Sequence, residues 1–336
     1  MIKDAIGRLV AGQDMTREMT VNAMKAIMSG ETTPAQTAAF ITALAIKGES
    51  VDEIAGCAEV MREKAVTIRA EEPFVDVVGT GGDKIGTFNV STAAGLVVAG
   101  AGIRVAKHGN RAASSRSGSA DVLAKLGVNL DADVPAVERC IAEARFGFMF
   151  APKMHAAMKH AIGPRREIGI RTVFNILGPL TNPAGARNML LGVFSEQMVD
   201  VLASVLRNLG SDRVYVVHGM DGLDEITTTD ETVVAELNDD VIKTYRIKPE
   251  DFGLPRATLD DLIVEGPDES AEVIRGVLAG RPGPARDIVV LNAAAGIAAG
   301  GGAPDLKTGA VKAAEAIDSG SANAVLEKVV EISHEG

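Results

Sequence analysis

The chain has 336 residues, of which 46% are hydrophobic and 24% are charged, and its formal net charge is −11. This length suits two domains, or one domain with a large appendage, and the composition suits a soluble globular protein with a hydrophobic core. The negative charge, together with an aromatic content of 3% and no tryptophan, argues against nucleic-acid binding, which needs a basic surface and aromatic stacking platforms.

Residues 1–70 predict a region made of helices only. Apolar residues recur there at three- and four-residue spacing. Thr33 and Ser50 are typical of helix N-termini, and Gly30 and Gly48 are typical of helix C-termini.

From residue 74 onward, short apolar strands alternate with helices. We expect strands at residues 74–79, 103–109, 146–150, 189–194 and 213–219, with further short β-segments over 227–247. This alternation predicts an α/β fold with a mostly parallel central sheet.

Residues 153–182 interrupt the alternation with helix-like sequence, which we expect to pack back onto the helices of 1–70. The α/β domain then comprises residues 71–152 and 183–336. It ends in alanine-rich helices, from about residue 286 to 332, that a glycine-rich segment breaks.

The chain gives no sign of a membrane span or a secretion signal. No apolar run reaches the roughly 18 residues that a membrane-spanning helix needs, and the N-terminus carries an early acid without a long apolar stretch. Cys57 and Cys140 lie in helix-like sequence without metal-ligand spacing, so we expect buried, reduced thiols. We therefore expect a cytoplasmic protein with no membrane or nucleic-acid partner.

The strand at 74–79 leads into GTGGD and then into Asn-Val-Ser-Thr at 89–92, which opens an apolar helix. Glycines after a strand let the backbone turn sharply and approach a ligand, and unpaired amides at a helix start attract anions. Asn89, Ser91 and Thr92 could add hydrogen bonds to phosphate or sugar oxygens, and a serine hydroxyl beside a phosphate can ligate Mg²⁺. The stretch is neither a Walker A loop nor GxGxxG. The alternative is a glycine turn with helix caps and no ligand.

A second polar loop follows the strand at 103–109. Lys107, His108, Arg111 and Arg116 stand there among serines and glycines. Positively charged side chains and hydroxyls on a glycine-containing loop predict a second anion-binding site. The alternative is a solvated polar loop. A lone histidine is more often structural than catalytic.

Two further stretches carry charged groups. Asp224 and Glu225 are adjacent carboxylates after the strand at 213–219, and hard oxygen ligands of this kind suit Mg²⁺, although an acidic surface turn would look the same. Arg165 and Arg166 follow Gly-Pro in helical sequence, where an arginine could clamp a carboxylate or simply be solvated. The stretch GPLTNP at 178–183 predicts a rigid linker or hinge. By contrast, Asp260-Asp261 predicts only a helix start or a surface turn.

Taken together, these stretches resemble the anthranilate phosphoribosyltransferases. The resemblance rests on GTGGD at 79–83, NVST at 89–92, KHGNRAASSRSGSADVLAKLG at 107–127, GPRREIGIRTVFNILGPLTNP at 163–183 and GLDE at 222–225. It covers nearly the whole chain, with the motifs in family order. It implies transfer of a phosphoribosyl group from phosphoribosyl pyrophosphate (PRPP) to anthranilate, with Mg²⁺ as cofactor. It also implies a small helical domain hinged to a larger α/β domain, with the active site in the cleft, and a homodimer formed through the helical domain.

The resemblance also implies residue roles. PRPP would be bound by Gly79, Gly82, Asp83, Thr87, Asn89, Val90, Ser91, Thr92, Lys107, His108, Gly109, Asn110, Arg111, Ala112, Ala113, Ser114, Ser115 and Ser119. Anthranilate would be bound by Gly79, Asn110 and Arg165, and Mg²⁺ by Ser91, Asp224 and Glu225.

Two alternatives stay open at this point. A pyrimidine nucleoside phosphorylase shares the implied fold, but the Asn110-Arg111 pair and the acids of GLDE favour PRPP and magnesium. A non-catalytic homologue that binds nucleic acid would need a basic face and degraded motifs, and the sequence has the opposite. The resemblance leaves open a complex with a separate anthranilate synthase.

Overall fold

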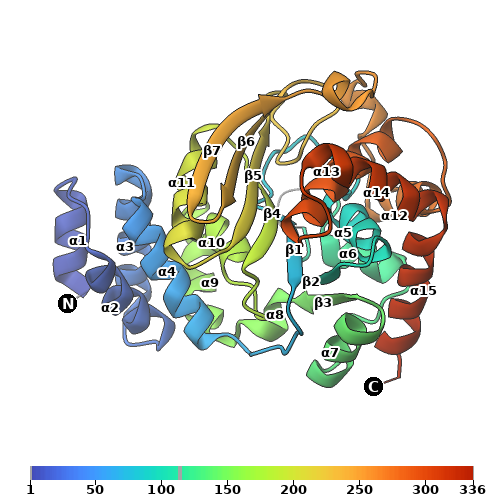
Figure 1. Ribbon diagram of the computed structural model, residues 1–336. Coiled ribbons are helices and arrows are strands. Elements are labelled where there is room, and N and C mark those ends of the chain that lie inside the picture. The colour runs from blue at the N-terminus through green and yellow to red at the C-terminus, as the bar shows by residue number, and fades with distance from the viewer. Residues whose placement is uncertain (1, 113–115, 336) are drawn as a thin grey trace.

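The computed structural model describes residues 2–112 and 116–335. Its N-terminal part contains only helices, as predicted (Figure 1). These are α1 (Ile2–Val10), α2 (Arg17–Met28), α3 (Pro34–Lys47) and α4 (Val51–Lys64). The predicted helix starts are confirmed, because Thr33 and Ser50 each form a capping box, in which the cap hydroxyl and a side chain three residues later satisfy each other's backbone amides.

The centre of the molecule is a seven-stranded sheet in the order β3-β2-β1-β4-β5-β6-β7. Its strands are β1 (Phe74–Gly79), β2 (Arg104–Gly109), β3 (Phe146–Phe150), β4 (Asn188–Gly192), β5 (Arg213–Gly219), β6 (Thr232–Asn238) and β7 (Val241–Ile247). The first five run parallel, and the hairpin β6–β7 adds two antiparallel strands at one edge. The expected strands and the mostly parallel sheet are thus confirmed.

Helices cover both faces of the sheet (Figure 1). They are α5 (Val90–Gly100), α6 (Ser119–Lys125), α7 (Val134–Glu143), α11 (Gln197–Asn208), α12 (Pro267–Leu278), α13 (Pro284–Ala299), α14 (Leu306–Asp318) and α15 (Ser321–Ser333). Strand β4 shows how the two faces divide: Leu190 packs into the core under α5 and α13, whereas Met189 and Leu191 pack into the core shared with α11 and the N-terminal helices. This alternation is the period of two that a strand buried on both faces requires.

The segment that interrupts the α/β pattern is helical. It contains α8 (Ala151–Met154), α9 (Lys159–Ile168) and α10 (Phe174–Leu180). Helix α9 packs on α2 and α3, and α10 packs on α4, so the segment shares the core of the N-terminal helices. The domain boundaries themselves stay a prediction.

The prediction of a linker at 178–183 is wrong for its first half. Gly178 and Pro179 lie inside the last turn of α10, and the chain leaves the helix only at Thr181. A proline is tolerated there because it removes a single helical hydrogen bond near the end of a short helix. The Thr181 hydroxyl instead donates to the carbonyl of Gly178.

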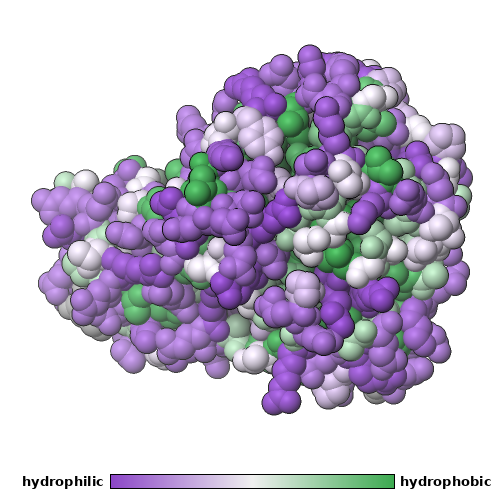
Figure 2. Space-filling model, viewed as in Figure 1, coloured by the Kyte–Doolittle hydropathy of each residue, from purple (hydrophilic) through white to green (hydrophobic). Residues whose placement is uncertain are grey.

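Two smaller expectations, on the cysteines and on Asp260-Asp261, are also confirmed. Cys57 and Cys140 are buried free thiols. Asp260 and Asp261 lie in a short 3₁₀ turn, Leu259–Asp261. No helix in the described parts of the chain combines the length and the hydropathy of a membrane span. The face of the molecule seen in Figure 2 is mostly hydrophilic, with small scattered apolar patches.

Candidate active site

A cavity of about 830 Å³ opens where the parallel strands end. The loops after β1, β2 and β5 line it, together with the start of α5 and the region from α9 to α10. Strand β1 lies between β2 and β4, so the strand order reverses beside it. Ligands of open α/β sheets bind at such a switch point, outside the carboxyl ends of the strands.

The glycine loop after β1 is shaped by close approaches that no other residue permits. A Cβ atom on Gly79 would lie 2.3 Å from Oδ2 of Asp224. Gly81 and Gly82 have positive φ angles of 66° and 86°, which favour glycine. The Gly81 amide donates to Asp224 Oδ2 at 2.7 Å, so this loop and the acidic loop hold each other in place.

Helix α5 directs its N-terminus at the cavity. The side chain of Asn89 caps the helix by accepting from the Thr92 amide at 3.1 Å, and it donates to the carbonyl of Ser117 at 3.1 Å. Ser91 lies in the first turn and lines the cavity. The dipole of this turn favours a negatively charged ligand.

Lys107 forms the floor of the cavity. Its side chain is almost completely buried, and Nζ donates to the carbonyl of Val77 at 2.5 Å and to Ser91 Oγ at 3.2 Å. Burial lowers the pKa of this amine, while the buried carboxyl of Asp76 opposes the change. A buried ammonium group beside a helix N-terminus is a strong attractor for phosphate oxygens.

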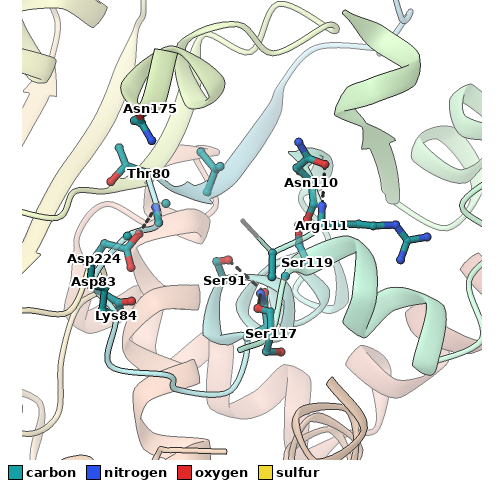
Figure 3. A pocket seen from close by; sticks show the side chains of 18 of the residues that line it. Thr80, Asp83, Lys84, Ser91, Asn110, Arg111, Ser117, Ser119, Asn175 and Asp224 are labelled. Carbon is teal, nitrogen blue, oxygen red and sulfur yellow. Dashed lines mark hydrogen bonds between the residues drawn. The ribbon is translucent and has the colours of Figure 1, made fainter. Parts of the chain in front are cut away.

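Asp83 and Asp224 lie on the side of the cavity opposite Asn110 and Ser119 (Figure 3), and Glu225 also lines the cavity. Burial, and then the charge of Asp83, raise the pKa of Asp224 to about 6. Burial and the neighbouring Asp224 raise the pKa of Glu225 well above its usual value. Burial is the main cause of both shifts, and a divalent cation bound here would favour the ionised forms of the two carboxyl groups.

The oxygen-bearing side chains on this side of the cavity are of the kind that binds magnesium. Among the residues that the structure describes, no three His, Cys, Asp or Glu side chains are grouped to hold a metal ion by themselves. Magnesium typically takes one or two carboxylates and completes its octahedron with waters and substrate phosphates. Ser91 stands near the acids, because its Oγ accepts from Lys107 Nζ at 3.2 Å and the charge of Lys107 opposes the raised pKa of both carboxyl groups. The predicted set of Ser91, Asp224 and Glu225 therefore meets in one place.

Arg165 lies at the end of α9 and faces the same cavity. Its guanidinium group stands 4.9 Å from the ring centroid of Phe174, and it is half-buried. Within the described residues it has no carboxylate partner, and burial lowers its pKa. A half-buried arginine without a counter-ion can accept the carboxylate of a ligand. Its neighbour Arg166 is exposed and does not line the cavity.

Comparison with known proteins agrees with this geometry. Two family descriptions match the chain: "Glycosyl transferase family, helical bundle domain" over residues 3–65 and "Glycosyl transferase family, a/b domain" over residues 71–323. The anthranilate phosphoribosyltransferase of Rhodospirillum rubrum is 54% identical over 98% of this chain and 95% of its own length. That of Geotalea daltonii is 53% identical over 98% of both chains. This chain belongs to the anthranilate phosphoribosyltransferase family.

Solved structures of the family have the same fold. Anthranilate phosphoribosyltransferase from Thermus thermophilus superposes with a TM-score of 0.93 at 45% identity, over 98% of this chain and 99% of that one. The enzyme from Saccharomyces cerevisiae in complex with PRPP and Mg superposes with a TM-score of 0.89 at 29% identity, over 99% and 97% of the two chains. Family membership and the two-part fold are therefore confirmed.

The structure brings nearly all described members of the predicted family site around the one cavity. The lining includes Gly79, Gly82, Asp83, Thr87, Asn89, Val90, Ser91, Lys107, His108, Gly109, Asn110, Arg111, Ala112, Ser119, Arg165, Asp224 and Glu225. Thr92 is the exception, because it is fully buried and does not line the cavity. Ala113, Ser114 and Ser115 lie outside the described residues.

Sequence reasoning missed some lining residues of this family's site. They are Thr80, Lys84, Arg171, Phe174 and Asn175, several of which are labelled in Figure 3. Ser117 also lines the cavity, and it belongs to the serines of the predicted second anion-binding site. In the described structure, the hydroxyls of Thr80 and Ser117 are buried and have no hydrogen-bond partner. Arg171 donates to the carbonyl of Gly82 at 2.9 Å and thereby links the helical segment to the glycine loop. Thr80 stood inside the glycine motif and could have been found there, whereas nothing in the sequence indicates the partner of Arg171.

Proposed function

We propose that this chain transfers the phosphoribosyl group of PRPP to the amino nitrogen of anthranilate, giving N-(5-phosphoribosyl)anthranilate and pyrophosphate. The reaction is magnesium-dependent and is the second step from chorismate to tryptophan. One observation carries the proposal: a single cavity combines a phosphate cradle over Lys107, the acid pair Asp224–Glu225 and an arginine without a counter-ion. Relatives that are more than half identical over nearly the full length carry this name, which supports it.

PRPP is held by the loops after β1 and β2 and by the start of α5. The amides of the glycine loop and of the first turn of α5 bind phosphate oxygens, and Lys107 adds a buried positive charge. We assign to PRPP the residues Gly79, Gly82, Asp83, Thr87, Asn89, Val90, Ser91, Thr92, Lys107, His108, Gly109, Asn110, Arg111, Ala112, Ala113, Ser114, Ser115 and Ser119.

The acids of the loop after β5 have a different task. Asp224 and Glu225, with the hydroxyl of Ser91, would hold magnesium on the pyrophosphate side of the cavity. A bound magnesium ion supplies positive charge that offsets the charge developing on the leaving pyrophosphate. Lys107 and the loop amides contribute to the same stabilisation from the protein itself.

Anthranilate enters from the side of α9. Arg165 binds its carboxylate, and Gly79 and Asn110 complete its site. The amino nitrogen attacks C1 of the ribose, the C1–N bond forms, and the C1–O bond to pyrophosphate breaks with its electron pair passing to the pyrophosphate oxygen. The nitrogen then loses a proton to solvent, so no strong general base is needed. Placement of the two substrates alone can remove about 7–11 kcal/mol of the barrier.

The wider organisation belongs to the same proposal. Residues 1–70 and 153–182 act as one helical domain, hinged to an α/β domain of residues 71–152 and 183–336. A homodimer forms through the helical domain, where Val10 and Ile46 are 75% and 81% exposed on α1 and α3, two helices that pack together. A cytoplasmic location is supported by the two unpaired, buried thiols.

Anthranilate fluorescence tests the function directly. The chain has no tryptophan and two tyrosines, so the protein contributes little background. Loss of anthranilate signal that requires both PRPP and Mg²⁺ would establish the reaction. A flat trace with folded protein would refute it, and thymidine or uridine with phosphate would then test the nucleoside phosphorylase alternative.

A further inference from the structure

The two acids proposed to hold magnesium sit on a loop with no regular structure of its own. Residues 220–231 join β5 to β6 and contain neither a helix nor a strand. Backbone amides and carbonyls in such a loop need partners from elsewhere when they are buried. The positions of Asp224 and Glu225 therefore depend on the contacts that other elements make with this loop.

The strands of the sheet make one close contact with the loop. A Cβ atom on Gly192 would lie 1.6 Å from the backbone carbonyl oxygen of Asp224, and one on Gly79 would lie 2.3 Å from its carboxylate. The chain at Asp224 is therefore pressed against the carboxyl ends of β1 and β4. This contact fixes the backbone before Glu225.

A further contact comes from the side chain of Asn292 on α13. The Ile226 amide donates to Asn292 Oδ1 at 2.9 Å, and Asn292 Nδ2 donates to the Ile226 carbonyl at 2.8 Å. A side-chain amide thus pairs with both polar groups of the residue directly after Glu225. The second N–H of Asn292 donates to the carbonyl of Ile288 on its own helix at 2.9 Å, so both donors are used.

Asn292 is a polar residue in an apolar part of the core. Around it, α13 is almost entirely apolar, and the helix packs on α5 and β4. Asn292 itself is completely buried. A buried polar side chain costs free energy unless its hydrogen bonds are made, and here they specify one position of one loop residue.

We propose that Asn292 is a positioning residue for the magnesium-binding acids, holding the backbone after Glu225 so that both carboxylates face one cation. The proposal rests on the function proposed above. Residues that orient metal ligands typically contribute 10–100-fold to metal affinity. Without Asn292, the buried amide and carbonyl of Ile226 lose their partners and the acids lose their fixed spacing.

The test compares Asn292→Ala with Asn188→Ala. Asn188 is also buried, but it lies at the start of β4, at the opposite end of the strand from the cavity, where it donates to the Phe74 carbonyl at 3.4 Å. Each variant is assayed for the Mg²⁺ concentration that gives half-maximal transfer. Mn²⁺ binding is measured by electron paramagnetic resonance with PRPP present and anthranilate absent, which reads cation affinity without turnover. If Asn292→Ala does not fold, Asn292→Ser replaces it.

For the Asn292 variant we expect at least a tenfold rise in both the Mg²⁺ requirement and the Mn²⁺ dissociation constant. Its kcat at saturating Mg²⁺ should stay within a few-fold of the wild type. Asn188→Ala should lower the melting temperature and leave both cation constants unchanged. Equal cation constants in the two variants would overturn the positioning role while leaving the proposed function intact. A wild-type protein that shows no Mg²⁺-dependent transfer would overturn the function itself.

Discussion

Replacing Arg165 by alanine should weaken the use of anthranilate much more than the binding of PRPP. Arg165 faces the cavity from α9 and is half-buried, and its guanidinium lies 4.9 Å from the ring centroid of Phe174. Without a ligand, this guanidinium has no carboxylate partner within the described residues. Its charge is thus free to bind the carboxylate of anthranilate, and the phosphate cradle over Lys107 does not depend on it.

The size of the effect follows from the kind of contact that is lost. A hydrogen-bonded ion pair of this type contributes about 1.5–3 kcal/mol. Arg165→Ala should therefore raise the KM for anthranilate about 10- to 150-fold, since about 1.4 kcal/mol is a factor of ten. Arg165→Lys keeps the charge but not the bidentate geometry, so it should recover only part of the loss.

The assay is anthranilate fluorescence at saturating PRPP and Mg²⁺, with PRPP binding measured separately by calorimetry. Arg166→Ala is the matched control, because Arg166 is the next residue along the helix but is exposed and does not line the cavity. It should behave as the wild type. Equal losses of anthranilate use and PRPP binding in Arg165→Ala would remove the role assigned to Arg165.

Three further changes test the rest of the site. Asp224→Asn with Glu225→Gln should lower activity and raise the Mg²⁺ concentration needed for half-maximal rate, and an unchanged magnesium profile would show that these acids do not hold the ion. Gly79→Ala should reduce activity at least tenfold, because the added Cβ would stand 2.3 Å from Asp224 Oδ2, whereas Gly163→Ala, with nothing within 4 Å, should be neutral. Burial lowers the pKa of His108 to about 3, so its contribution to stability is complete above about pH 6.5 and is lost as the pH falls toward 3. In the His108→Asn variant, the free energy of unfolding, measured by denaturant titration, should therefore fall less between about pH 6.5 and 4 than it does in the wild type. An equal fall in both proteins would contradict the assignment of this pH dependence to His108.

The fold could be predicted from the sequence where local patterns decide it. The short apolar runs ending in glycine became parallel strands, and the capping residues Thr33 and Ser50 start helices as expected. The pattern gave the wrong answer at Gly178-Pro179, where both residues are typical turn formers but packing keeps them in the last turn of α10. Local propensity is a weak guide wherever tertiary contacts outweigh it.

The site divides in the same way. Loops that follow strands of a parallel sheet meet at one edge, and the glycine loop, the Lys107 loop and the acid pair do so here. From the sequence, the grouping of all three was implied by the family resemblance. Contacts between distant segments could not be foreseen. Arg171 bonds the carbonyl of Gly82, 89 residues earlier in the chain, and Asn292 pairs with Ile226, 66 residues earlier. Neither arginine nor asparagine carries a sequence signal that names its partner.

The distribution of charge in the cavity explains why the cation and the phosphorylated substrate need each other. Asp224 and Glu225 have raised pKa values because burial, and then the charge of neighbouring acids, disfavour their ionised forms. Without a cation, ionised carboxylates on this side would repel the pyrophosphate group that Lys107 and the amides of α5 attract. If these two carboxylates hold magnesium, they would satisfy only part of its coordination shell, and substrate phosphates and waters would complete it. Bound magnesium thus lowers the electrostatic repulsion that PRPP would meet, and PRPP supplies oxygen ligands that magnesium would lack. By thermodynamic linkage, each of the two raises the affinity of the other by the same factor.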